Sequence, residues 1–248
     1  MPCLEVQIPA ADGRSNGTLH VPDGGGPWPG VVVFPDAGGV RETFRQMGDR
    51  LAGLGYAVLI PDIYYRAGRW APFDVATLFT DKKERRRMQR LVYPLTNKAI
   101  IADAGAYGDF LLARPEVTGS AIGTTGYCLG GRLSLIAATG LGHKIAAAAS
   151  FHGGRLAVQG DRSSPHLAVG RITATVYVAG AEEDGSFTAE QATLLDSALT
   201  GAGVDHTVEF YPARHGFAVP DNPTYDASAS DRHWTALRDL YGARLRAA

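Results

Sequence analysis

The sequence predicts an α/β fold in which a mostly parallel central sheet is flanked by helices on both faces. Strand-like and helix-like segments alternate along the chain from residue 30 onward, as is typical of parallel strands joined by crossover helices. Several strand-like segments, including residues 30–34 and 57–60, are continuous apolar runs. Runs of this kind are expected of strands that are buried on both faces of the sheet.

Each element is predicted from the spacing of its apolar residues and from the glycine and proline residues that end it. Strands are expected at residues 4–8, 18–21, 30–34, 57–60, 121–125, 145–151, 175–178 and 207–210. Helices are expected at residues 43–54, 81–91, 96–113, 133–139, 189–199 and 226–245. The segments 63–80 and 153–171 have no regular pattern. Because no repeat and no long linker interrupts this order, we expect a single domain over residues 1–248.

Composition excludes several classes of protein. The chain has 248 residues, of which 45% are hydrophobic and 20% are charged, so it can form a packed core. Its formal charge of −1 gives no electrostatic footprint for nucleic acid or an anionic membrane. No apolar stretch reaches the roughly 18 residues that a bilayer requires. With two cysteines and no secretory signal pattern, we expect a cytoplasmic monomer or small homo-oligomer.

One strand-turn-helix segment carries a candidate nucleophile. Residues 126–131 (GYCLGG) match the nucleophile-elbow pattern G-x-S-x-G, with Cys128 in place of the serine. The residues two before and two after the nucleophile must be very small, because the turn is strained. The N-terminus of the following helix favours a thiolate at Cys128, and the backbone N–H of Leu129 supplies one oxyanion donor. A cysteine among glycines is also compatible with a small buried hydrophobe.

A base and an acid follow in the order expected for α/β-hydrolases. His215 comes directly after the last predicted strand, and an acidic segment, residues 182–184 (EED), follows the strand at 175–178. The carboxyl ends of parallel strands meet at one edge of the sheet, so both are expected near Cys128. A carboxylate there fixes the imidazole tautomer and stabilises the imidazolium. Asp184 and Glu183 both remain candidates for this acid.

These residues resemble the dienelactone hydrolase family, a cysteine-nucleophile branch of the α/β-hydrolase fold. The resemblance covers most of the chain and rests on residues 126–131 (GYCLGG), 61–64 (PDIY) and 215–218 (HGFA). It implies a hydrolase with Cys128 as nucleophile, His215 as base and an aspartate as orienting acid. Asp184, with Phe187 three positions later, fits the family pattern better than Glu183. Neither a cofactor nor a metal is implied, and the sequence contains no zinc-type or nucleotide-binding motif.

The resemblance also gives expectations for the rest of the site. Asp36 occupies the position of a family glutamate that contacts the resting thiol, so it either gates Cys128 or shapes its loop. The N–H of Ala37 is expected to be the second oxyanion donor. Apart from the resemblance, Tyr65 lies in an aromatic-rich loop that either lines the substrate pocket or packs in the core. His152 ends the strand at 145–151 and either lines the pocket or is a hydrogen-bonded structural histidine. Two departures concern the family's substrate arginines: Val219 occupies one position, and the other falls to an arginine run at residues 85–90, which equally suits a solvated helix face.

The leading functional hypothesis is a cofactor-independent hydrolase of small esters or lactones that forms a thioester at Cys128. One alternative is a non-hydrolytic binding or redox-sensor protein, in which Asp36 holds a reactive thiol. Another is a thioesterase or acyltransferase with the same triad. The neutral charge provides no docking patch for an acidic carrier protein, which disfavours the last of these hypotheses.

Overall fold

The computed structural model describes residues 3–245 and contains an eight-stranded sheet with the strand order β1-β2-β4-β3-β5-β6-β7-β8. The strands are β1 (Cys3–Ala10), β2 (Gly13–His20), β3 (Trp28–Phe34), β4 (Ala57–Pro61), β5 (Val117–Tyr127), β6 (Ile145–Phe151), β7 (Thr175–Glu183) and β8 (His206–Arg214). From β4 to β8 all neighbouring strands are parallel, whereas β2 pairs antiparallel with both β1 and β4.

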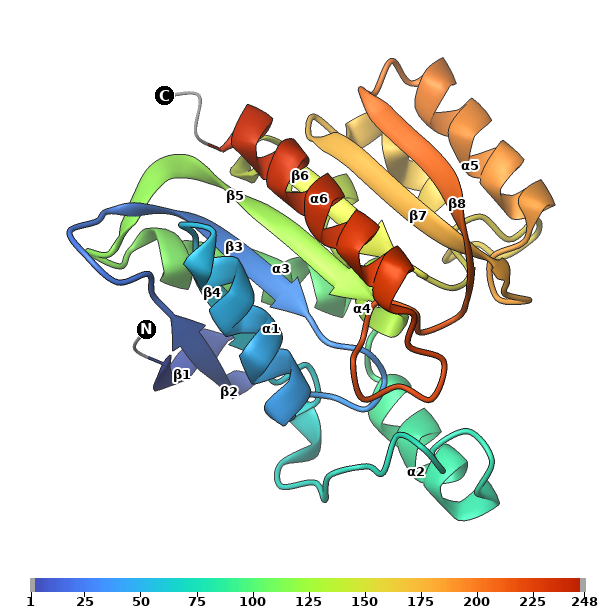
Figure 1. Ribbon diagram of the computed structural model, residues 1–248, viewed down its shortest axis with the longest axis horizontal. Coiled ribbons are helices and arrows are strands. Elements are labelled where there is room, and N and C mark those ends of the chain that lie inside the picture. The colour runs from blue at the N-terminus through green and yellow to red at the C-terminus, as the bar shows by residue number, and fades with distance from the viewer. Residues whose placement is uncertain (1–2, 246–248) are drawn as a thin grey trace.

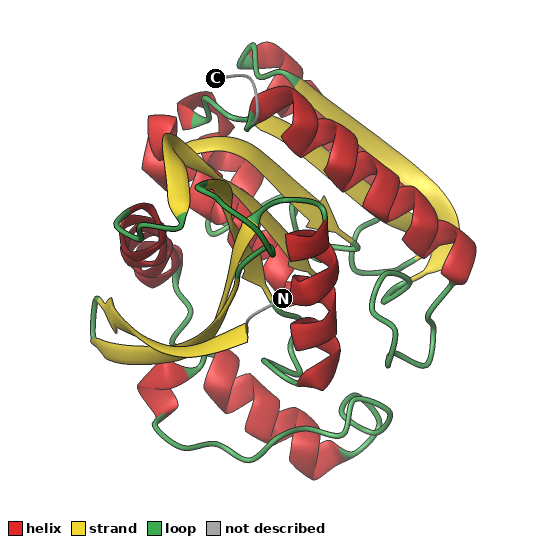
Figure 2. Ribbon diagram, turned by 60° about the vertical axis from the view of Figure 1, so that its left-hand side comes forward, coloured by secondary structure: helices red, strands yellow, loops and turns green. Residues whose placement is uncertain are grey.

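Helices cover both faces of the sheet, which confirms the predicted fold class (Figures 1 and 2). On one face lie α1 (Glu42–Gly53) and α6 (Ala227–Arg244), and on the other lie α3 (Asn97–Leu112), α4 (Leu129–Leu141) and α5 (Ala189–Gly201). The short helix α2 (Lys82–Val92) has no buried residue and projects beyond the sheet. Short 3-10 helices lie at Tyr65–Ala67, Gly142–Lys144 and Pro165–Arg171.

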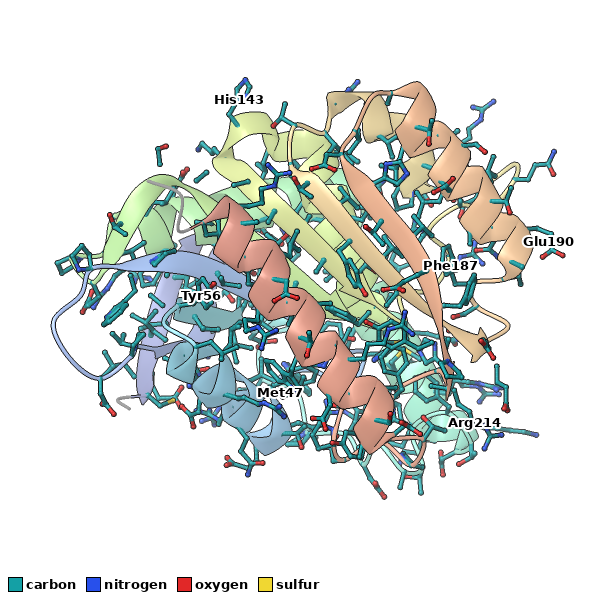
Figure 3. All side chains as sticks on the ribbon, turned by 45° about the horizontal axis from the view of Figure 1, so that its top comes forward. Met47, Tyr56, His143, Phe187, Glu190 and Arg214 are labelled. Atoms are coloured by element: carbon teal, nitrogen blue, oxygen red, sulfur yellow. The ribbon has the colours of Figure 1, made fainter. Side chains whose placement is uncertain are left out.

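A separate hydrophobic core fills each face of the sheet. Met47 and Tyr56 belong to the core beneath α1 and α6, and Phe187 belongs to the core on the opposite face (Figure 3). Strand residues alternate between these two cores: Val32 and Phe34 of β3 face one, and Val31 and Val33 face the other. Because these parallel strands are buried on both faces of the sheet, their sequences are continuous apolar runs.

Helix capping explains why the predicted starts of α2, α3, α5 and α6 agree with the structure to within one residue. The side chains of Asp81, Thr96, Thr188 and Asp226 each accept a hydrogen bond from a backbone N–H of the helix that follows. Such caps satisfy backbone donors that have no partner within the helix. The cap at Asp81 therefore marks the start of the helix predicted at 81–91, although none of the side chains in that helix is buried.

Two elements differ from the sequence prediction near the site. Helix α4 begins at Leu129 rather than at residue 133, and Gly130 and Gly131 belong to its first turn. Strand β7 continues to Glu183, so the predicted acidic loop lies partly within the sheet. Both differences place residues of the candidate site on regular elements rather than on loops.

No helix within residues 3–245 combines the length and the apolar character needed to cross a bilayer.

Candidate active site

Cys128 occupies a sharp turn between β5 and α4, as the elbow pattern predicts. Its backbone has φ 53° and ψ −115°, a conformation that is uncommon for a residue with a side chain. A Cβ on Gly126 would lie 2.0 Å from the carbonyl oxygen of Gly130, and one on Gly130 would lie 2.1 Å from that of Phe34. The turn therefore requires glycine on both sides of Cys128, and it brings β3 against the first turn of α4.

We expect Gly130→Ala to destabilise the protein strongly, because its methyl group would meet backbone atoms that cannot turn away. Overpacking of this kind costs about 3 kcal/mol, which for a chain of this size corresponds to a loss of roughly 10 °C in Tm. Gly242→Ala in α6 is the matched control, since nothing lies within 4 Å of a Cβ there. Thermal unfolding of both variants tests this, and equal melting temperatures would contradict the close approach.

The structure brings Asp184 and His215 together. His215 Nδ1 lies 2.6 Å from Asp184 Oδ2, and the Asp184 side chain is 3% exposed. Asp184 Oδ1 also accepts the N–H of Ser186 at 2.8 Å, which fixes the plane of the carboxylate. Glu183 points elsewhere: it is 73% exposed and lies 3.3 Å from Arg214. Of the two acids that the sequence left open, only Asp184 is placed to orient the imidazole.

The electrostatics of the site favour a charged imidazole on His215. Burial disfavours the imidazolium, but interactions with Cys128 and with the Asp184 carboxylate outweigh burial and raise the pKa of His215 to about 10. Burial likewise opposes ionisation of Asp184, yet hydrogen bonds from His215 and Ser186 lower the pKa of that carboxyl. Asp184 therefore stays ionised and supports a proton on His215 Nδ1.

Two backbone donors are free at the start of α4 and in the loop after β3. Within residues 3–245, neither the N–H of Leu129 nor that of Ala37 donates a hydrogen bond to another protein group. The close approach of Gly130 to the carbonyls of Phe34 and Pro35 packs this loop against the helix start. The hydroxyl of Tyr64 donates to the carbonyl oxygen of Ala37 at 3.0 Å and so steadies the peptide segment.

Asp36 is bound to its own loop rather than to the thiol. Its Oδ1 and Oδ2 each accept a hydrogen bond from Arg41 at 2.8 Å, and Oδ1 also accepts the N–H of Gly38. Arg41 simultaneously makes two hydrogen bonds to Asp221, at 2.7 and 2.8 Å. With both oxygens engaged in this way, the geometry fits the loop-shaping role of the two that the sequence offered.

His152 is hydrogen-bonded to the backbone of Cys128 and is not among the residues that line the cavity over Cys128, so the expectation that it lines the pocket is not met. Its Nδ1 accepts the N–H of Cys128 at 3.1 Å, an N–H that also reaches the carbonyl of Phe151 at 3.1 Å. The ring is fully buried and packs edge-on against His215 and Phe217. Burial and the charge of His215 keep the pKa of His152 well below its usual range. The ring is therefore neutral, with its proton on Nε2, and it helps to position the elbow.

Tyr65 lies away from Cys128. Its hydroxyl donates to Asp103 at 2.7 Å and accepts the N–H of Asp12, so it is part of a polar cluster near the β1–β2 turn. The expectation that Tyr65 lines the pocket is not met, because the 3-10 turn at Tyr65–Ala67 directs its side chain away and leaves Tyr64 at the site.

The arginine run on α2 also stays outside the site. Arg87 bonds to Glu84 and stacks on Phe73, and Arg86 and Arg90 line a separate surface hollow with Tyr93.

A cavity of about 320 Å³ opens over the candidate triad. It is lined by Phe79, Cys128, Leu129, Arg132, Gly154, Arg155, Asp184, Ser186 and His215. Sequence reasoning identified Cys128, Leu129, Asp184 and His215 but missed the other five residues. Phe79 lies in a segment without regular pattern, and the two arginines carry no motif, so only the folded chain brings them to the cavity.

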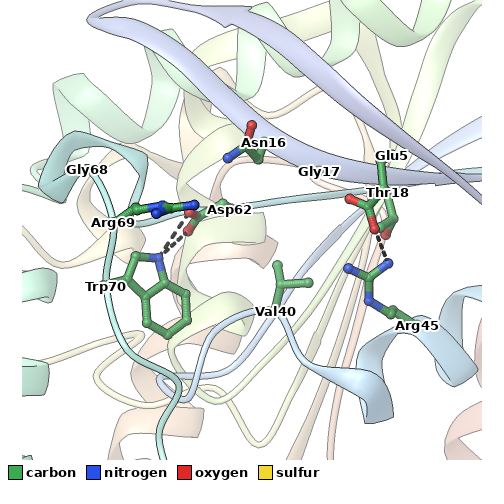
Figure 4. Close-up of a pocket in the computed structure, with 10 residues that line it drawn as sticks. All are labelled: Glu5, Asn16, Gly17, Thr18, Val40, Arg45, Asp62, Gly68, Arg69 and Trp70. Carbon is green, nitrogen blue, oxygen red and sulfur yellow. Dashed lines mark hydrogen bonds and ion pairs between the residues drawn. The ribbon is translucent and has the colours of Figure 1, made fainter.

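A second cavity, of about 260 Å³, lies near β2 and the end of β4 (Figure 4). Its lining is polar and includes an ion pair between Glu5 and Arg45 and hydrogen bonds from Trp70 to Asp62. No cysteine or histidine lines this second cavity within the described residues. Cys128 and His215 instead line the first cavity together.

Comparison with known proteins places the chain in a family. The model of the dienelactone hydrolase family matches residues 16–245. A Methylorubrum extorquens protein named "Putative carboxymethylenebutenolidase" is 30% identical over 248 residues, covering 96% of this chain and 79% of the relative. The carboxymethylenebutenolidase of Pseudomonas putida is 29% identical over 136 residues, which are 54% of this chain and 56% of that protein.

A solved structure supports the same assignment. The crystal structure of a dienelactone hydrolase-like promiscuous phosphotriesterase from metagenomic libraries has a TM-score of 0.81 and 29% identity, and the match covers 98% of each chain. The resemblance in the elbow and histidine motifs, the family match over most of the sequence and the shared fold all agree. The chain belongs to the dienelactone hydrolase family and is a hydrolase of the ester and lactone class.

Proposed function

We propose that the chain hydrolyses small esters or lactones through a Cys128–His215–Asp184 triad and a thioester intermediate, without a cofactor. The observation that carries this proposal is the 2.6 Å contact between Asp184 and His215 in the same cavity as an elbow cysteine. The names of its relatives, carboxymethylenebutenolidases, support a lactone or ester as the substrate.

In the first half-reaction, the Cys128 thiolate attacks the carbonyl carbon and forms a C–S bond. Negative charge that develops on the carbonyl oxygen is met by the free N–H groups of Leu129 and Ala37. One such donor lowers the barrier by about 3 kcal/mol. As the C–O bond breaks, His215 gives its proton to the departing alkoxide, which leaves a thioester and a neutral imidazole.

In the second half-reaction, neutral His215 takes a proton from water while that water attacks the thioester carbonyl. The C–S bond breaks, the carboxylic acid leaves and the thiolate is restored next to an imidazolium. Asp184 keeps the proton on Nδ1 throughout, so that Nε2 is the atom that exchanges protons with substrate and water. His152 holds the backbone of Cys128 from behind during both steps.

Trapping the acylated enzyme tests this proposal. The wild-type protein is mixed with 4-nitrophenyl acetate, quenched in acid within the first turnovers and digested for peptide mass spectrometry. We expect an acetyl group on Cys128 together with continuous release of nitrophenol. Acetylation that stops after one equivalent would instead favour the non-hydrolytic sensor hypothesis, and acetylation confined to another residue would overturn the assignment of the nucleophile.

A further inference from the structure

The second cavity, beside β2 and the end of β4, has no role in the proposed reaction, because the candidate triad lines the other one. Its lining includes two acidic side chains and two arginines, so that their formal charges cancel. Glu5 and Arg45 form an ion pair at 2.6 Å on one side of the cavity (Figure 4). The other two charged residues, Asp62 and Arg69, lie on the opposite side together with Trp70.

Neither Asp62 nor Arg69 has an ion-pair partner within the described residues. The Asp62 carboxylate is partly buried and accepts hydrogen bonds only from neutral donors. These are the N–H of Tyr64 at 2.8 Å and the indole Nε1–H of Trp70, which lies 3.2 Å from Oδ1 and 3.0 Å from Oδ2. Arg69 is exposed and has no ion pair or hydrogen bond within residues 3–245. The cavity therefore presents one unbalanced charge of each sign.

A bound molecule could balance both charges. A partly buried carboxylate without a cation is costly, because neutral donors replace only part of its hydration. Burial accordingly raises the pKa of Asp62. Its Oδ2 atom accepts only from Trp70 within the described residues, so it has room for another donor. Because Arg69 at the same side has free donors for an anion, a ligand that satisfies both residues must carry both charges.

The aromatic wall of the second cavity is already fixed in place. The indole ring of Trp70 contacts the rings of Tyr64 and Phe73 at centroid distances of 5.5 and 5.9 Å. It also packs on Gly39, where a Cβ would lie 2.5 Å from a ring carbon. Val40, the next residue along, adds an apolar side chain to the lining. A preformed surface of this kind binds a small molecule without the cost of ordering its side chains.

We propose that the second cavity binds a small zwitterion of the α-amino-acid type, with its ammonium group on Asp62 and its carboxylate on Arg69. An ammonium group has three donors, one of which can use the open position on Oδ2 of Asp62. Guanidinium groups bind carboxylates through paired hydrogen bonds. The side chain of the ligand would lie against Trp70 and Val40. This site is independent of hydrolysis at Cys128 and adds a second ligand to the protein.

The indole N–H signal of Trp70 tests the site, because this group donates to the carboxylate that receives the ammonium. The chain has three tryptophans, so a ¹H–¹⁵N spectrum contains three indole signals, and Trp70→Phe identifies the one of Trp70. L-leucine is the probe, since the recognised groups are common to α-amino acids. We expect it to shift this signal saturably. Leucinamide, with only the positive charge, and N-acetyl-L-leucine, with only the negative charge, should bind about tenfold more weakly, since each loses a charged hydrogen bond.

Exposed arginines supply matched variants that leave the core untouched. Arg69→Gln should weaken leucine binding about tenfold and abolish the advantage of leucine over leucinamide. Arg69→Lys keeps the charge and should retain part of that advantage. Arg14→Gln removes the same charge from an exposed residue of β2 that does not line the cavity, so it should bind leucine as the wild type does.

Three results would overturn the proposal. The first is a Trp70 signal that L-leucine leaves unmoved at about 10 mM, where a site with a Kd of about 1 mM is mostly filled. The second is leucinamide binding as tightly as leucine, because the cavity would then take a cation alone. The third is unchanged leucine binding in Arg69→Gln. Since none of these measurements involves turnover, they stand apart from the outcome of the acylation experiment on Cys128.

Discussion

Cys128→Ala is expected to reduce ester hydrolysis by a factor of about 10⁵ or more, as removal of the nucleophile does in other triads. Without the sulfur, no thioester forms and His215 has no thiolate partner, although the oxyanion donors and the cavity remain. The measurement is kcat with 4-nitrophenyl acetate at substrate saturation. Because alanine fits the space of a thiol with one atom fewer, the variant should keep the far-UV circular dichroism spectrum of the wild type.

The second cysteine provides the matched control. Cys3 is exposed on β1, far along the sheet from the cavity over Cys128, so Cys3→Ala should retain wild-type kcat. A Cys128→Ala protein that is folded and still turns over the ester at the wild-type rate would refute the nucleophile. Loss of activity in Cys3→Ala as well would point to a general effect of cysteine removal.

Asp184→Asn is expected to lower kcat by about 10⁴, the loss seen when a triad carboxylate becomes an amide. The amide keeps the shape of the side chain, but it no longer demands a proton on His215 Nδ1 and no longer stabilises the imidazolium. Since the carboxylate helps to raise the pKa of His215 to about 10, the variant should also titrate its histidine at lower pH. Steady-state kinetics and an NMR titration of the His215 ring measure both effects.

Glu183→Gln serves as the comparison for this result. It removes a neighbouring negative charge but touches only Arg214 at the surface, so kcat should stay within about twofold of the wild type, as expected for an exposed ion pair. If the large loss occurs in Glu183→Gln and not in Asp184→Asn, then Glu183 and not Asp184 is the acid that orients His215.

The fold was predictable because its signals are local. The strand β6 was predicted with the bounds that it has, since an apolar run lies between a lysine and a histidine. The positions of Cys128, Asp184 and His215 followed from topology, because each lies at or just beyond the carboxyl end of a parallel strand. Parallel pairing then brings together residues that are far apart in sequence.

What the sequence did not provide are contacts decided by loop side chains. Nothing in the order of residues indicates that Arg41 captures Asp36, or that Arg132 is held by Ser163. The choice between Tyr64 and Tyr65 depends on a single 3-10 turn, which a spacing argument does not resolve. Such contacts depend on side-chain geometry that appears only when the loops are folded over the sheet edge.

Arg41 joins two parts of the protein that would otherwise be independent. Its guanidinium group donates hydrogen bonds to Asp36, which precedes Ala37 in the loop after β3. It also donates hydrogen bonds to Asp221, which lies 180 residues further along the chain in the segment after His215. The Arg41 side chain thus acts as a non-covalent cross-link between the loop that contains Ala37 and the segment that follows His215. We therefore expect the fluctuations of these two segments to be coupled, so that local opening of one segment removes contacts that hold the other.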